Sequence, residues 1–445
     1  MTFSPASLLD RLGALETGAN KPQRYVIALS GGLDSTVLAA ALAVTREVHG
    51  KALYAIHIDH QLQPESAEWS GQCRELAVRL GIDFIAESVD VDPESGSGLE
   101  AAARAARYTA LAAHMRPGDW LLSAHHRDDQ AETLLLNLMR GSGPAGLAGI
   151  GLINSFASGW LVRPLIDVPR AALEKFATEV KLDWVEDPSN EDRRFDRNYL
   201  RHEILPRLEG RWPDVMARLA RSADLAGEAA MLLEDLADFD LSAIGDRPER
   251  INIDGLVQLS RARQGNLLRY ALRRAGLPLP GAARLAAVLD QLVPAKEDAQ
   301  PVVTWPGAEI RRYRGKLYAL AAGEEPVQPE EGSVLGGTPL ELTQGLGILS
   351  LSPGAALGLN EAVIERGLTV HYRRGGEQFR PAGQRHTKKL KKLLQESGVV
   401  PWMRERIPLL YAGEQLVAVA DLWVAADAAS EPGTAIRWNG RPALH

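Results

Sequence analysis

A glycine-containing turn near the N-terminus has residue types that suit the binding of a phosphate group. It lies in the segment VIALSGGLDSTVLA, residues 26–39, where an apolar strand-like run leads into a helical pattern. The glycines allow backbone angles that other residues avoid, which lets an anion approach the amides. A helix that starts directly after the turn adds free N–H groups and the positive end of its dipole. The residues expected to contact phosphate are Ser30, Gly31, Gly32, Leu33, Asp34 and Ser35.

Asp34 is the unexpected member of this turn, because a carboxylate repels a bare phosphate. We therefore expect a magnesium ion to bridge Asp34 and the phosphate groups. The sequence G-x-x-x-x-G-K-[ST] does not occur in the chain, which argues against a Walker-type NTPase. A tight strand-to-helix turn with a helix cap is the alternative. The S-G-G-x-D-S pattern after an apolar strand favours phosphate binding.

Two histidines and three acids gather in the sequence AHHRDDQAET, residues 124–133. The histidines end a predicted strand, and the acids lie in the first turn of the helix that follows, where carboxylates stabilise the helix N-terminus. The same groups would suit a magnesium ion or an ammonium group. Zinc is not favoured, since the spacing is not H-x-x-x-H and no cysteine assists. These candidates are His125, His126, Asp128, Asp129 and Glu132.

Two further segments carry candidates at a strand end and on a helix face. The sequence HIDHQLQPES follows the second predicted strand, and its His57 is either a nucleotide contact or a strand-end residue that faces solvent. In GLEAAARAARY, Glu100, Arg104 and Arg107 share one helix face through spacings of four and three residues. An ion pair on a solvated helix usually explains such a pattern. Beside a phosphate loop, we favour arginines that face phosphate.

The elements that must position these residues form three regions. From residue 24 to about 150, short apolar runs alternate with longer helical patterns, which is typical of βαβ units and a doubly wound parallel α/β sheet. From about 212 to 325 the chain is rich in Ala, Leu and Arg, which predicts a mainly helical region that ends in a strand-like AEIRRYRGKLYALA. We predict a catalytic domain over 1–211, a helical middle domain over 212–330 and a small α+β domain over 340–445.

Composition limits the class of protein. The 445 residues are too many for one ordinary core, and 45% apolar with 24% charged residues is typical of a soluble globular chain. The single cysteine, Cys73, excludes an internal disulfide framework and a cysteine-rich metal site. No apolar run would span a bilayer and no signal peptide is evident, so we expect a cytoplasmic protein with no membrane partner. The stretch GEEPVQPEEGSVLGG predicts a linker.

The net charge of −7 argues against an overall basic nucleic-acid binder, but a local basic group lies near the C-terminus. The sequence HTKKLKKLLQESG, residues 386–398, predicts a helix with leucines on its packing face. A solvated amphipathic helix is the plain explanation. Because the lysines have no acidic partner in the first turns and arginines lie upstream, we favour contact with nucleic-acid phosphates. The candidates are Arg373, Lys388, Lys389, Lys391 and Lys392.

These motifs resemble those of a known enzyme family. The turn at 30–35 is similar to the PP-loop of the N-type ATP pyrophosphatases, which cleave ATP between the α and β phosphates and adenylate a carbonyl-type oxygen. The longer runs resemble the tRNA(Ile)-lysidine synthases; Gln61, where that family often has glycine, is one departure. The matching runs are 98–108, HHRDDQAETLLLNLMRGSGPAGL at 125–147, RPLI at 163–166, DPSN at 187–190, RNYLRHEILPRL at 197–208 and the basic segment at 373–411.

The resemblance implies a two-step ligation in an adenine nucleotide α-hydrolase-like fold, with ATP and Mg²⁺ as cofactors. The C2 oxygen of the wobble cytidine in a CAU-anticodon isoleucine tRNA attacks the α-phosphate of ATP, and pyrophosphate leaves. The ε-amine of free L-lysine then displaces AMP to form lysidine, so that the tRNA reads AUA instead of AUG. An adenylated oxygen is a good leaving group, and the work of the enzyme is positioning and charge neutralisation.

For this reaction, physical chemistry suggests roles for the candidates as hypotheses. Asp34, Asp128, Asp129 and Glu132 would be catalytic, with Asp34 and Asp129 at the metal. His57, Arg104 and Arg107 would join the PP-loop in binding ATP. Three assignments stay open: the carboxylate that binds magnesium, the carboxylate that binds the lysine ammonium, and the group that acts as general base. The residues that would contact lysine or tRNA are His125, His126, Arg140, Arg163, Arg201 and the C-terminal basic group.

Three other functions compete with lysidine formation. A tRNA thiolase would use the same adenylate, but most need a set of cysteines that Cys73 alone does not supply. An amidotransferase-linked ligase shares the loop, yet no N-terminal cysteine or glutaminase-length region is present. A non-catalytic tRNA-binding module is a third candidate, and the intact loop and acids argue against it. The sequence leaves the oligomeric state, including a homodimer, open.

Overall fold

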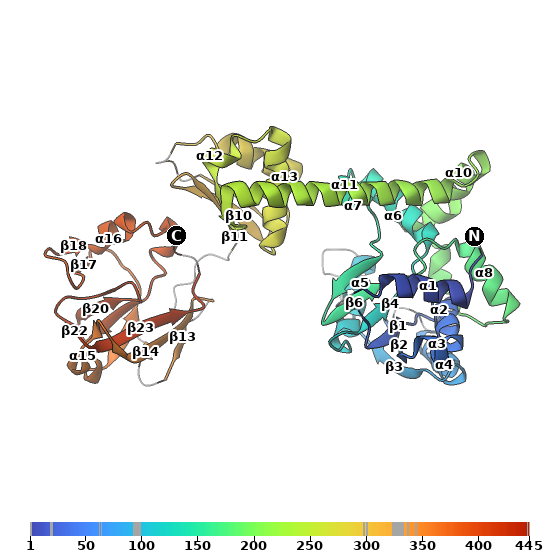
Figure 1. Ribbon diagram of the computed structural model, residues 1–445, viewed down its shortest axis with the longest axis horizontal. Helices are drawn as coiled ribbons and strands as arrows, with labels where there is room; N and C mark the ends of the chain where they lie inside the picture. Colours follow the sequence, from blue (N-terminus) through green and yellow to red (C-terminus); the bar gives the residue numbers. More distant parts are fainter. Residues whose placement is uncertain are drawn as a thin grey trace. The chain divides into compact units, whose positions relative to one another are not determined.

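The structure of the chain is a computed structural model (Figure 1). It divides into two compact units, residues 1–236 and 237–445. Gly98, Leu62, Pro64 and most of the predicted linker lie outside the described residues. These are 2–17, 21–61, 63, 65–91, 99–296, 299, 301–322, 333–335, 338–342, 345–442 and 444.

A six-stranded sheet forms the centre of the first unit. Its strand order is β3-β2-β1-β4-β6-β5, and neighbouring strands are parallel except for β5 and β6. The predicted doubly wound parallel sheet is therefore confirmed. The strands are β1 (Arg24–Ala28), β2 (Ala52–Asp59), β3 (Asp83–Ser88), β4 (Trp120–Leu122), β5 (Ile153–Phe156) and β6 (Gly159–Val162).

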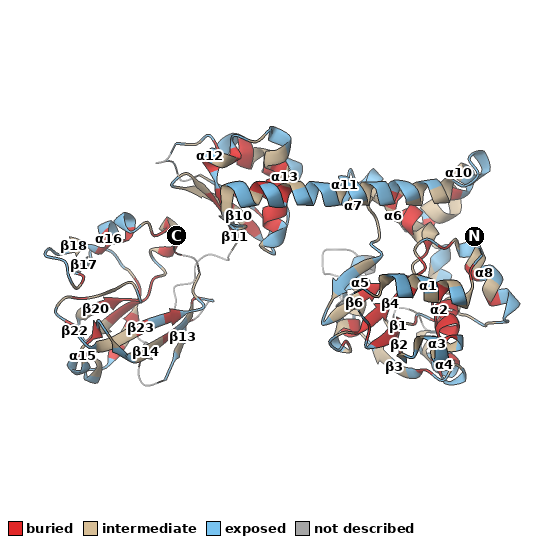
Figure 2. Ribbon diagram, in the orientation of Figure 1, coloured by how far each residue is buried: buried red, intermediate tan, exposed pale blue. Residues whose placement is uncertain are grey.

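Helices cover both faces of this sheet, so alternate residues of β1 enter two separate apolar cores. Tyr25 and Ile27 pack with residues of α1, α2, α4 and α8, whereas Val26 packs with residues of α5. Figure 2 shows these central strands as buried. The helices are α1 (Pro5–Leu15), α2 (Leu33–Val44), α3 (Arg46–His49), α4 (Ser66–Arg79), α5 (Leu99–Ala113), α6 (Arg127–Met139), α7 (Pro144–Leu147) and α8 (Arg170–Glu179).

The strand order changes direction at β1. From β1 the chain proceeds to β2 and β3 on one side of it and then returns to β4 on the other side. In open α/β sheets, the loops after two such strands leave a crevice at the carboxyl edge, where ligands bind. The glycine turn follows β1, and the histidine–aspartate segment follows β4. The topology of the sheet therefore brings together the two strongest sequence motifs.

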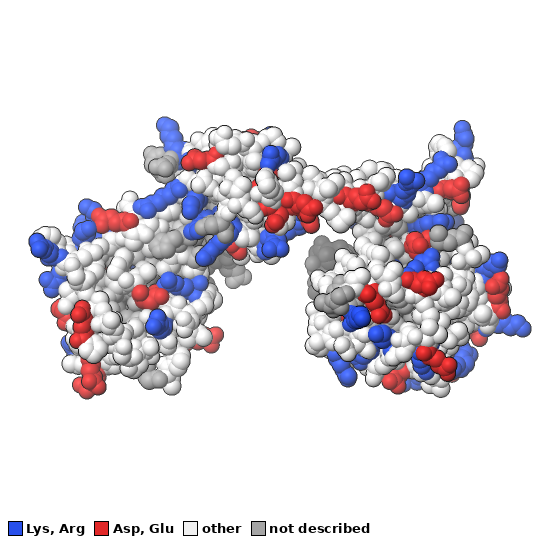
Figure 3. All heavy atoms as spheres, viewed as in Figure 1, with Lys and Arg blue, Asp and Glu red and all other residues white. Residues whose placement is uncertain are grey.

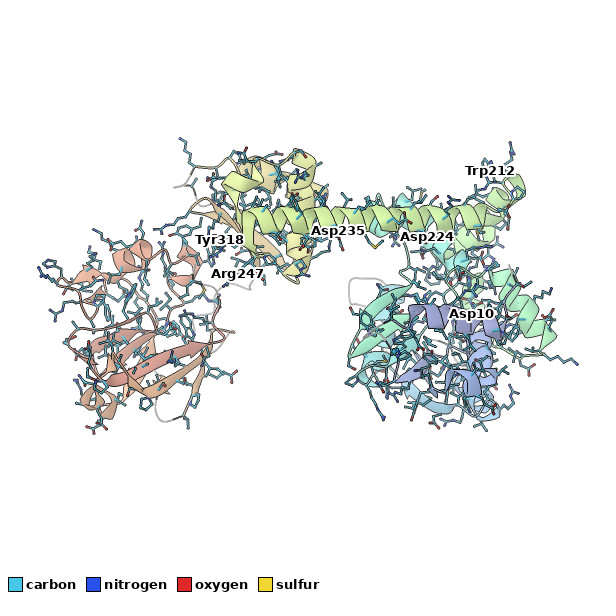
Figure 4. The ribbon with its side chains drawn as sticks, in the orientation of Figure 1. Asp10, Trp212, Asp224, Asp235, Arg247 and Tyr318 are labelled. Carbon is cyan, nitrogen blue, oxygen red and sulfur yellow. The ribbon has the colours of Figure 1, made fainter. Side chains whose placement is uncertain are left out.

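A helical stretch closes the first unit and leads out of it. Here α9 (Asp196–Tyr199), a π-helical turn η2 (Leu200–Ile204) and α10 (Leu205–Arg211) follow one another directly after the 3₁₀ turn η1 (Pro188–Glu191). Trp212, labelled in Figure 4, is the C-cap of α10. The long helix α11 (Val215–Ile244) then continues into the second unit.

The first part of the second unit combines helices with an antiparallel sheet of order β7-β8-β11-β10-β9. The predicted strand-like stretch is the hairpin of β10 and β11, and three strands were not predicted. The elements are β7 (Gly245–Arg247), β8 (Arg250–Asn252), α12 (Ile253–Leu256), α13 (Arg261–Arg274), α14 (Ala282–Ala287), the π turn η3 (Val288–Leu292), β9 (Val302–Trp305), β10 (Ala308–Tyr313) and β11 (Lys316–Ala321).

The C-terminal part is the expected small α+β fold, built mostly of antiparallel strands. Tyr318 of β11, labelled in Figure 4, belongs to its apolar core, with its ring 5.2 Å from that of Trp402. The elements are β12 (Ser333–Leu335), β13 (Leu340–Leu342), β14 (Gly347–Ala355), β15 (Gly358–Leu359), α15 (Glu361–Glu365), β16 (Leu368–His371), β17 (Gln378–Phe379), β18 (Lys388–Lys389), α16 (Leu390–Glu396), η4 (Pro401–Met403), β19 (Leu409–Ala412), β20 (Gln415–Val419), β21 (Trp423–Val424), β22 (Ala429–Ser430) and β23 (Gly433–Asn439).

The basic helix predicted over 386–398 is shorter in the structure. Lys388 and Lys389 pair with β17 as an antiparallel strand, and the helix begins only at Leu390. The predicted leucine face is correct, since Leu390, Leu393 and Leu394 are all buried. Pairing with β17 gives the backbone of Lys388 and Lys389 hydrogen-bond partners outside the helix.

Candidate active site

The glycine turn after β1 is held by hydrogen bonds among its own residues. Gly31 has a φ of +86°, a conformation that favours glycine, and Gly32 is the N-cap of α2 with no side-chain cap. Ser35 Oγ accepts from the Ser30 amide at 3.2 Å and donates to the Gly32 carbonyl at 3.1 Å. The start of α2 therefore presents backbone donors to an anion. Leu33 contributes its backbone, because its side chain lies in the core.

A buried layer supports this turn from beneath. A Cβ atom at Gly31 would lie 2.8 Å from Sγ of Cys73, and the Val185 amide donates to the Gly31 carbonyl at 2.9 Å. His57 is 6% exposed, and its Nδ1 lies 2.9 Å from the Leu29 carbonyl oxygen. Burial lowers the pKa of His57. The contacts of His57 are with the Leu29 backbone and with Sγ of Cys73 at 3.5 Å, both under the turn, so they favour a supporting role over the predicted nucleotide contact.

His126 connects the turn with helix α6. Its Nε2 lies 3.5 Å from Oδ2 of Asp34 and 3.5 Å from Oδ2 of Asp129. Its Nδ1 accepts from the Asp128 amide at 3.2 Å, and its own amide donates to Asp129 Oδ2 at 3.0 Å, which makes His126 the N-cap of α6. Burial would lower the pKa of His126, but Asp34, Asp129 and Asp128 outweigh burial and raise it.

Arg201 holds two acids of helix α6, Asp129 and Glu132. It donates through Nε to Glu132 Oε1 at 2.6 Å, and through Nη2 to Glu132 Oε2 at 2.9 Å and Asp129 Oδ1 at 3.3 Å. Burial would lower the pKa of Arg201, but the hydrogen bond and charge of Glu132 and the charge of Asp129 raise it. Arg197 adds a second guanidinium 3.6 Å from Glu132. The π-helical turn at Leu200–Ile204 contains Arg201, and such turns often occur at functional sites.

Asp34 has a buried carboxylate oxygen that makes no hydrogen bond. Its Oδ1 is buried and has no hydrogen-bond partner, whereas Asp128 Oδ2 accepts from the Arg170 amide at 2.7 Å. Within the described residues, no three His, Cys, Asp or Glu side chains form a metal-binding group. Mg²⁺ usually takes one or two carboxylates together with phosphate oxygens and water. Asp34 fits that requirement as a single carboxylate at a phosphate loop, while both oxygens of Asp129 already have partners.

A cluster of cationic side chains lies beside these acids. Arg104 and Arg107 of α5 lie with their guanidinium carbons 4.9 and 5.7 Å from the ring centre of Tyr108. Burial lowers the pKa of Arg107, and the charges of Arg104 and Arg197 lower it further. Burial also lowers the pKa of His125 to about 4, with Arg163, Arg104 and Arg107 acting in the same direction and Asp129 opposing. The concentration of positive charge makes this corner a favourable place for phosphate groups.

The comparisons with known proteins cover all three regions of the chain. Family models match residues 8–208 as a PP-loop domain, 251–318 as a TilS substrate binding domain and 368–438 as a TilS substrate C-terminal domain. The tRNA(Ile)-lysidine synthase of Alkalilimnicola ehrlichii is 43% identical over 444 residues, which is 99% of this chain and 96% of the relative. The chain belongs to the tRNA(Ile)-lysidine synthase family. Two further members, from Coxiella burnetii and Methylococcus capsulatus, are each 40% identical over 94% and 95% of this chain and 92% and 97% of their own lengths.

Membership of the lysidine synthase family confirms the predicted family, fold class and ligase activity. Among solved structures, the U34-tRNA thiolase NcsA from Methanococcus maripaludis covers 50% of this chain and 78% of its own, with 18% identity and a TM-score of 0.41. That likeness is too weak to support a thiolase. The individual roles of the site residues and the three domain boundaries stay predictions.

Two predicted substrate residues lie outside the acid cluster. Arg140 is the C-cap of α6, so it lies at the opposite end of that helix from Asp128. Arg163 is 6% exposed and donates to the Gly151 carbonyl and to Asn154 Oδ1 at 2.5 and 2.7 Å. These contacts hold the segment after α7, although the Nε of Arg163 is buried without a partner.

The C-terminal basic group is exposed only in part. Figure 3 shows Lys and Arg side chains around β17, β18 and α16. Lys388 donates to Glu396 at 2.8 Å, and Lys392 lies 4.0 Å from the same carboxylate. Arg373 is 13% exposed and lies 3.6 Å from Glu377. Lys389 and Lys391 are exposed, and so are Arg380 and Arg385 in the loop between the two short strands.

Sequence reasoning missed four residues that hold the site. Arg197 shares a helix face with Arg201, and the spacing of four residues in RNYLRHEILPRL is the signal that could have revealed it. Cys73, Val185 and Arg170 contact the loop or the acids from segments with no distinctive pattern.

Proposed function

We propose that this enzyme, which forms lysidine on tRNA(Ile) in an ATP-dependent reaction, joins the ε-amine of L-lysine to C2 of the wobble cytidine through an adenylated intermediate. The observation that carries the proposal is that the PP-loop acid Asp34 and the α6 acid Asp129 lie on the same nitrogen of His126, each 3.5 Å from it. The PP-loop suits nucleotide phosphates, and the acids of α6 suit a cationic amine.

The proposed chemistry has two balanced steps. The C2 carbonyl oxygen of cytidine attacks the α-phosphorus of ATP, the bond to the β-phosphate breaks, and pyrophosphate leaves. The neutral lysine amine then attacks C2, and AMP leaves with the original oxygen. The amine must first lose a proton to a nearby base. The tRNA gains a lysine and loses the elements of water, and its decoding changes from AUG to AUA.

The first step needs donors that stabilise the departing pyrophosphate. We assign this work to the PP-loop backbone and to Ser30, with Arg104 and Arg107 at the neighbouring phosphate, while Ser35 holds the turn through its bonds to Ser30 and Gly32. Asp34 would hold Mg²⁺, which supplies positive charge to the phosphate oxygens when bound. The buried, unpartnered Oδ1 of Asp34 supports this assignment.

The second step needs acids that attract the lysine ammonium. We assign Asp128 and Asp129 to this task, and we assign the buried Arg201–Glu132 pair to holding Asp129 in position. His125 and Arg163 lie at the same corner, where the charge of Arg163 acts on the His125 ring, and both are assigned to the lysine carboxylate or to tRNA. Since burial and the neighbouring arginines lower the pKa of His125 to about 4, its ring is neutral at pH 7 and is assigned a hydrogen-bonding contact rather than a charged one.

The tRNA itself needs a larger basic surface than this corner. We assign its phosphates to Arg140 and to the C-terminal basic group, in which Lys389 and Lys391 are exposed.

No helix in the described part of the chain is long and apolar enough to cross a membrane. We place the enzyme in the cytoplasm, where ATP, lysine and tRNA occur, and we include a homodimer in the proposal, which light scattering tests.

The test is AMP release from ATP with CAU-anticodon isoleucine tRNA as co-substrate. We expect turnover that requires both tRNA and lysine. Turnover that requires a sulfur donor or glutamine instead would contradict the proposal, and so would tRNA binding without any turnover. A matched tRNA with adenosine at the wobble position is the control, since it has no C2 carbonyl to adenylate.

A further inference from the structure

His126 occupies the boundary between the two halves of the site. The residue is 2% exposed, and its ring lies between the PP-loop, which follows β1, and helix α6, which follows β4. Its Nε2 is equally distant, at 3.5 Å, from Oδ2 of Asp34 and from Oδ2 of Asp129. A buried imidazole in this position cannot reach solvent, so its hydrogen bonds must be made within the site.

The neighbours of the ring determine where its hydrogen points. Nδ1 accepts from the Asp128 amide at 3.2 Å, so the hydrogen of the neutral ring is on Nε2. The protonated ring carries a hydrogen on Nε2 as well. In either state Nε2 is a donor directed at the carboxylates of Asp34 and Asp129. His126 therefore has two separate tasks, a helix cap through Nδ1 and a link to Asp34 through Nε2.

The link to Asp34 has a consequence for the nucleotide. It engages Oδ2 of Asp34 and leaves Oδ1 buried and without a hydrogen-bond partner. A carboxylate without this link could rotate and would present its two oxygens interchangeably. We propose that His126 is a positioning residue that orients Asp34 so that Oδ1 faces the magnesium–nucleotide ligand, rather than a residue that itself contacts lysine or tRNA. The inference rests on the proposed role of Asp34 in ATP binding.

A substitution can separate the two tasks of His126. Asparagine is a favoured N-cap residue, and its Oδ1 can accept the Asp128 amide as Nδ1 of histidine does. Its side chain is too short to reach Asp34. His126→Asn is thus expected to keep α6 capped and the thermal unfolding midpoint within a few degrees of the wild type, while it removes the link. His126→Ser, which also caps a helix, replaces it if the asparagine variant does not fold.

The test is a double-mutant cycle on binding of Mg²⁺·ATP, measured by calorimetry without tRNA or lysine. The four proteins are the wild type, His126→Asn, Asp34→Asn and the double variant. We expect each single change to weaken binding about tenfold, and the double variant to bind no more weakly than Asp34→Asn alone. Losses that multiply would overturn the inference, because they would show that His126 acts independently of Asp34. Unchanged binding in His126→Asn would overturn it too.

This experiment separates the positioning role from the proposed reaction. If the wild type binds Mg²⁺·ATP with the expected coupling but gives no lysine-dependent turnover, the proposed function fails and the role of His126 stands. If turnover is lysine-dependent but the cycle shows no coupling, the proposed function stands and the positioning role of His126 fails.

Discussion

Arg201 and Glu132 form a two-point ion pair inside the site, with donor–acceptor distances of 2.6 and 2.9 Å. Glu132 is 1% exposed, so its charge depends on this partner. The pair attaches the π-helical turn at 200–204 to helix α6. The same guanidinium donates to Asp129, so Arg201 links Glu132 and Asp129 in one hydrogen-bond network.

Glu132→Gln should destabilise the protein, because it leaves the Arg201 guanidinium without its main partner. Breaking a buried pair from one side typically costs about 3 kcal/mol. Arg193→Gln is the matched control, since it breaks an exposed pair with Glu203 in the same helical stretch, where the cost is below about 1 kcal/mol. Urea unfolding measures both. Equal losses in the two variants would contradict the structural role assigned to the Arg201–Glu132 pair.

Asp34→Asn should abolish ATP-dependent adenylation while the fold stays intact. The change keeps the shape of the side chain and removes the charge that would hold Mg²⁺ at the phosphate groups. Pyrophosphate release in the presence of tRNA measures the step, and circular dichroism checks the fold. Near-normal turnover would remove Asp34 from the metal role. Asp167→Asn, at an exposed ion pair with Arg11, is the control for a carboxylate outside the site.

Lys389→Glu combined with Lys391→Glu should weaken tRNA binding and leave ATP binding unchanged. These two lysines are better probes than Lys388 and Lys392, which share Glu396. Each phosphate contact that is lost should reduce the slope of log affinity against log salt by about one. Filter binding at several salt concentrations measures the slope. The same charge change at Lys175 and Lys181 on the first unit is the control, and an equal effect there would contradict a specific C-terminal surface.

Gln61→Gly should stabilise the protein by about 0.5–1 kcal/mol. Gln61 has a φ of +55°, a conformation that strains a residue with a side chain, and the Asp59 carboxylate that accepts its amide at 2.8 Å is retained. Gln72→Gly, in the middle of α4, should instead destabilise by a similar amount. Thermal unfolding distinguishes the two. A loss of stability in Gln61→Gly would show that the side chain makes a contribution larger than the strain.

Stability should fall as the pH is lowered from about 6.5 to about 4, in part because of His125. The unfolded chain binds a proton on this residue near pH 6.5, whereas burial and three arginines lower the folded-state pKa to about 4. Between these values only the unfolded state is protonated, so the free energy of unfolding decreases. His125→Asn should make the pH profile flatter in this window, with the exposed His386→Asn as control. An unchanged profile would contradict the buried, neutral state of His125.

The sequence predicted the sheet and the two motifs better than the contacts between them. Alternating strands and helices predicted a parallel sheet, and the structure shows that β1 and β4 are neighbours, so the segments after them share its ligand-binding edge. The pairing of Arg201 with Glu132 spans 69 positions of the chain, and no local pattern encodes such a contact. The support of the PP-loop by Cys73 and Val185 was missed for the same reason.

The C-terminal lysines show a second limit of local patterns. The leucine spacing predicted a helix, and the leucines are indeed buried, but Lys388 and Lys389 form a strand because β17 is available as a partner. Propensity could not reveal that partner, since tertiary pairing overrides it at short elements. Lys388 therefore lies in the strand and Glu396 at the end of helix α16, and their side chains form an ion pair across this change from strand to helix.

The most direct test of lysine ligation at the wobble position is nucleoside mass spectrometry. CAU-anticodon isoleucine tRNA, transcribed without modification, is incubated with the enzyme, Mg²⁺·ATP and L-lysine and then digested to nucleosides. We predict one cytidine derivative whose mass has increased by lysine less one water, present only when all components are added and absent with Asp34→Asn. Unmodified cytidine after AMP release, or a sulfur-containing product, would contradict lysidine formation by this site.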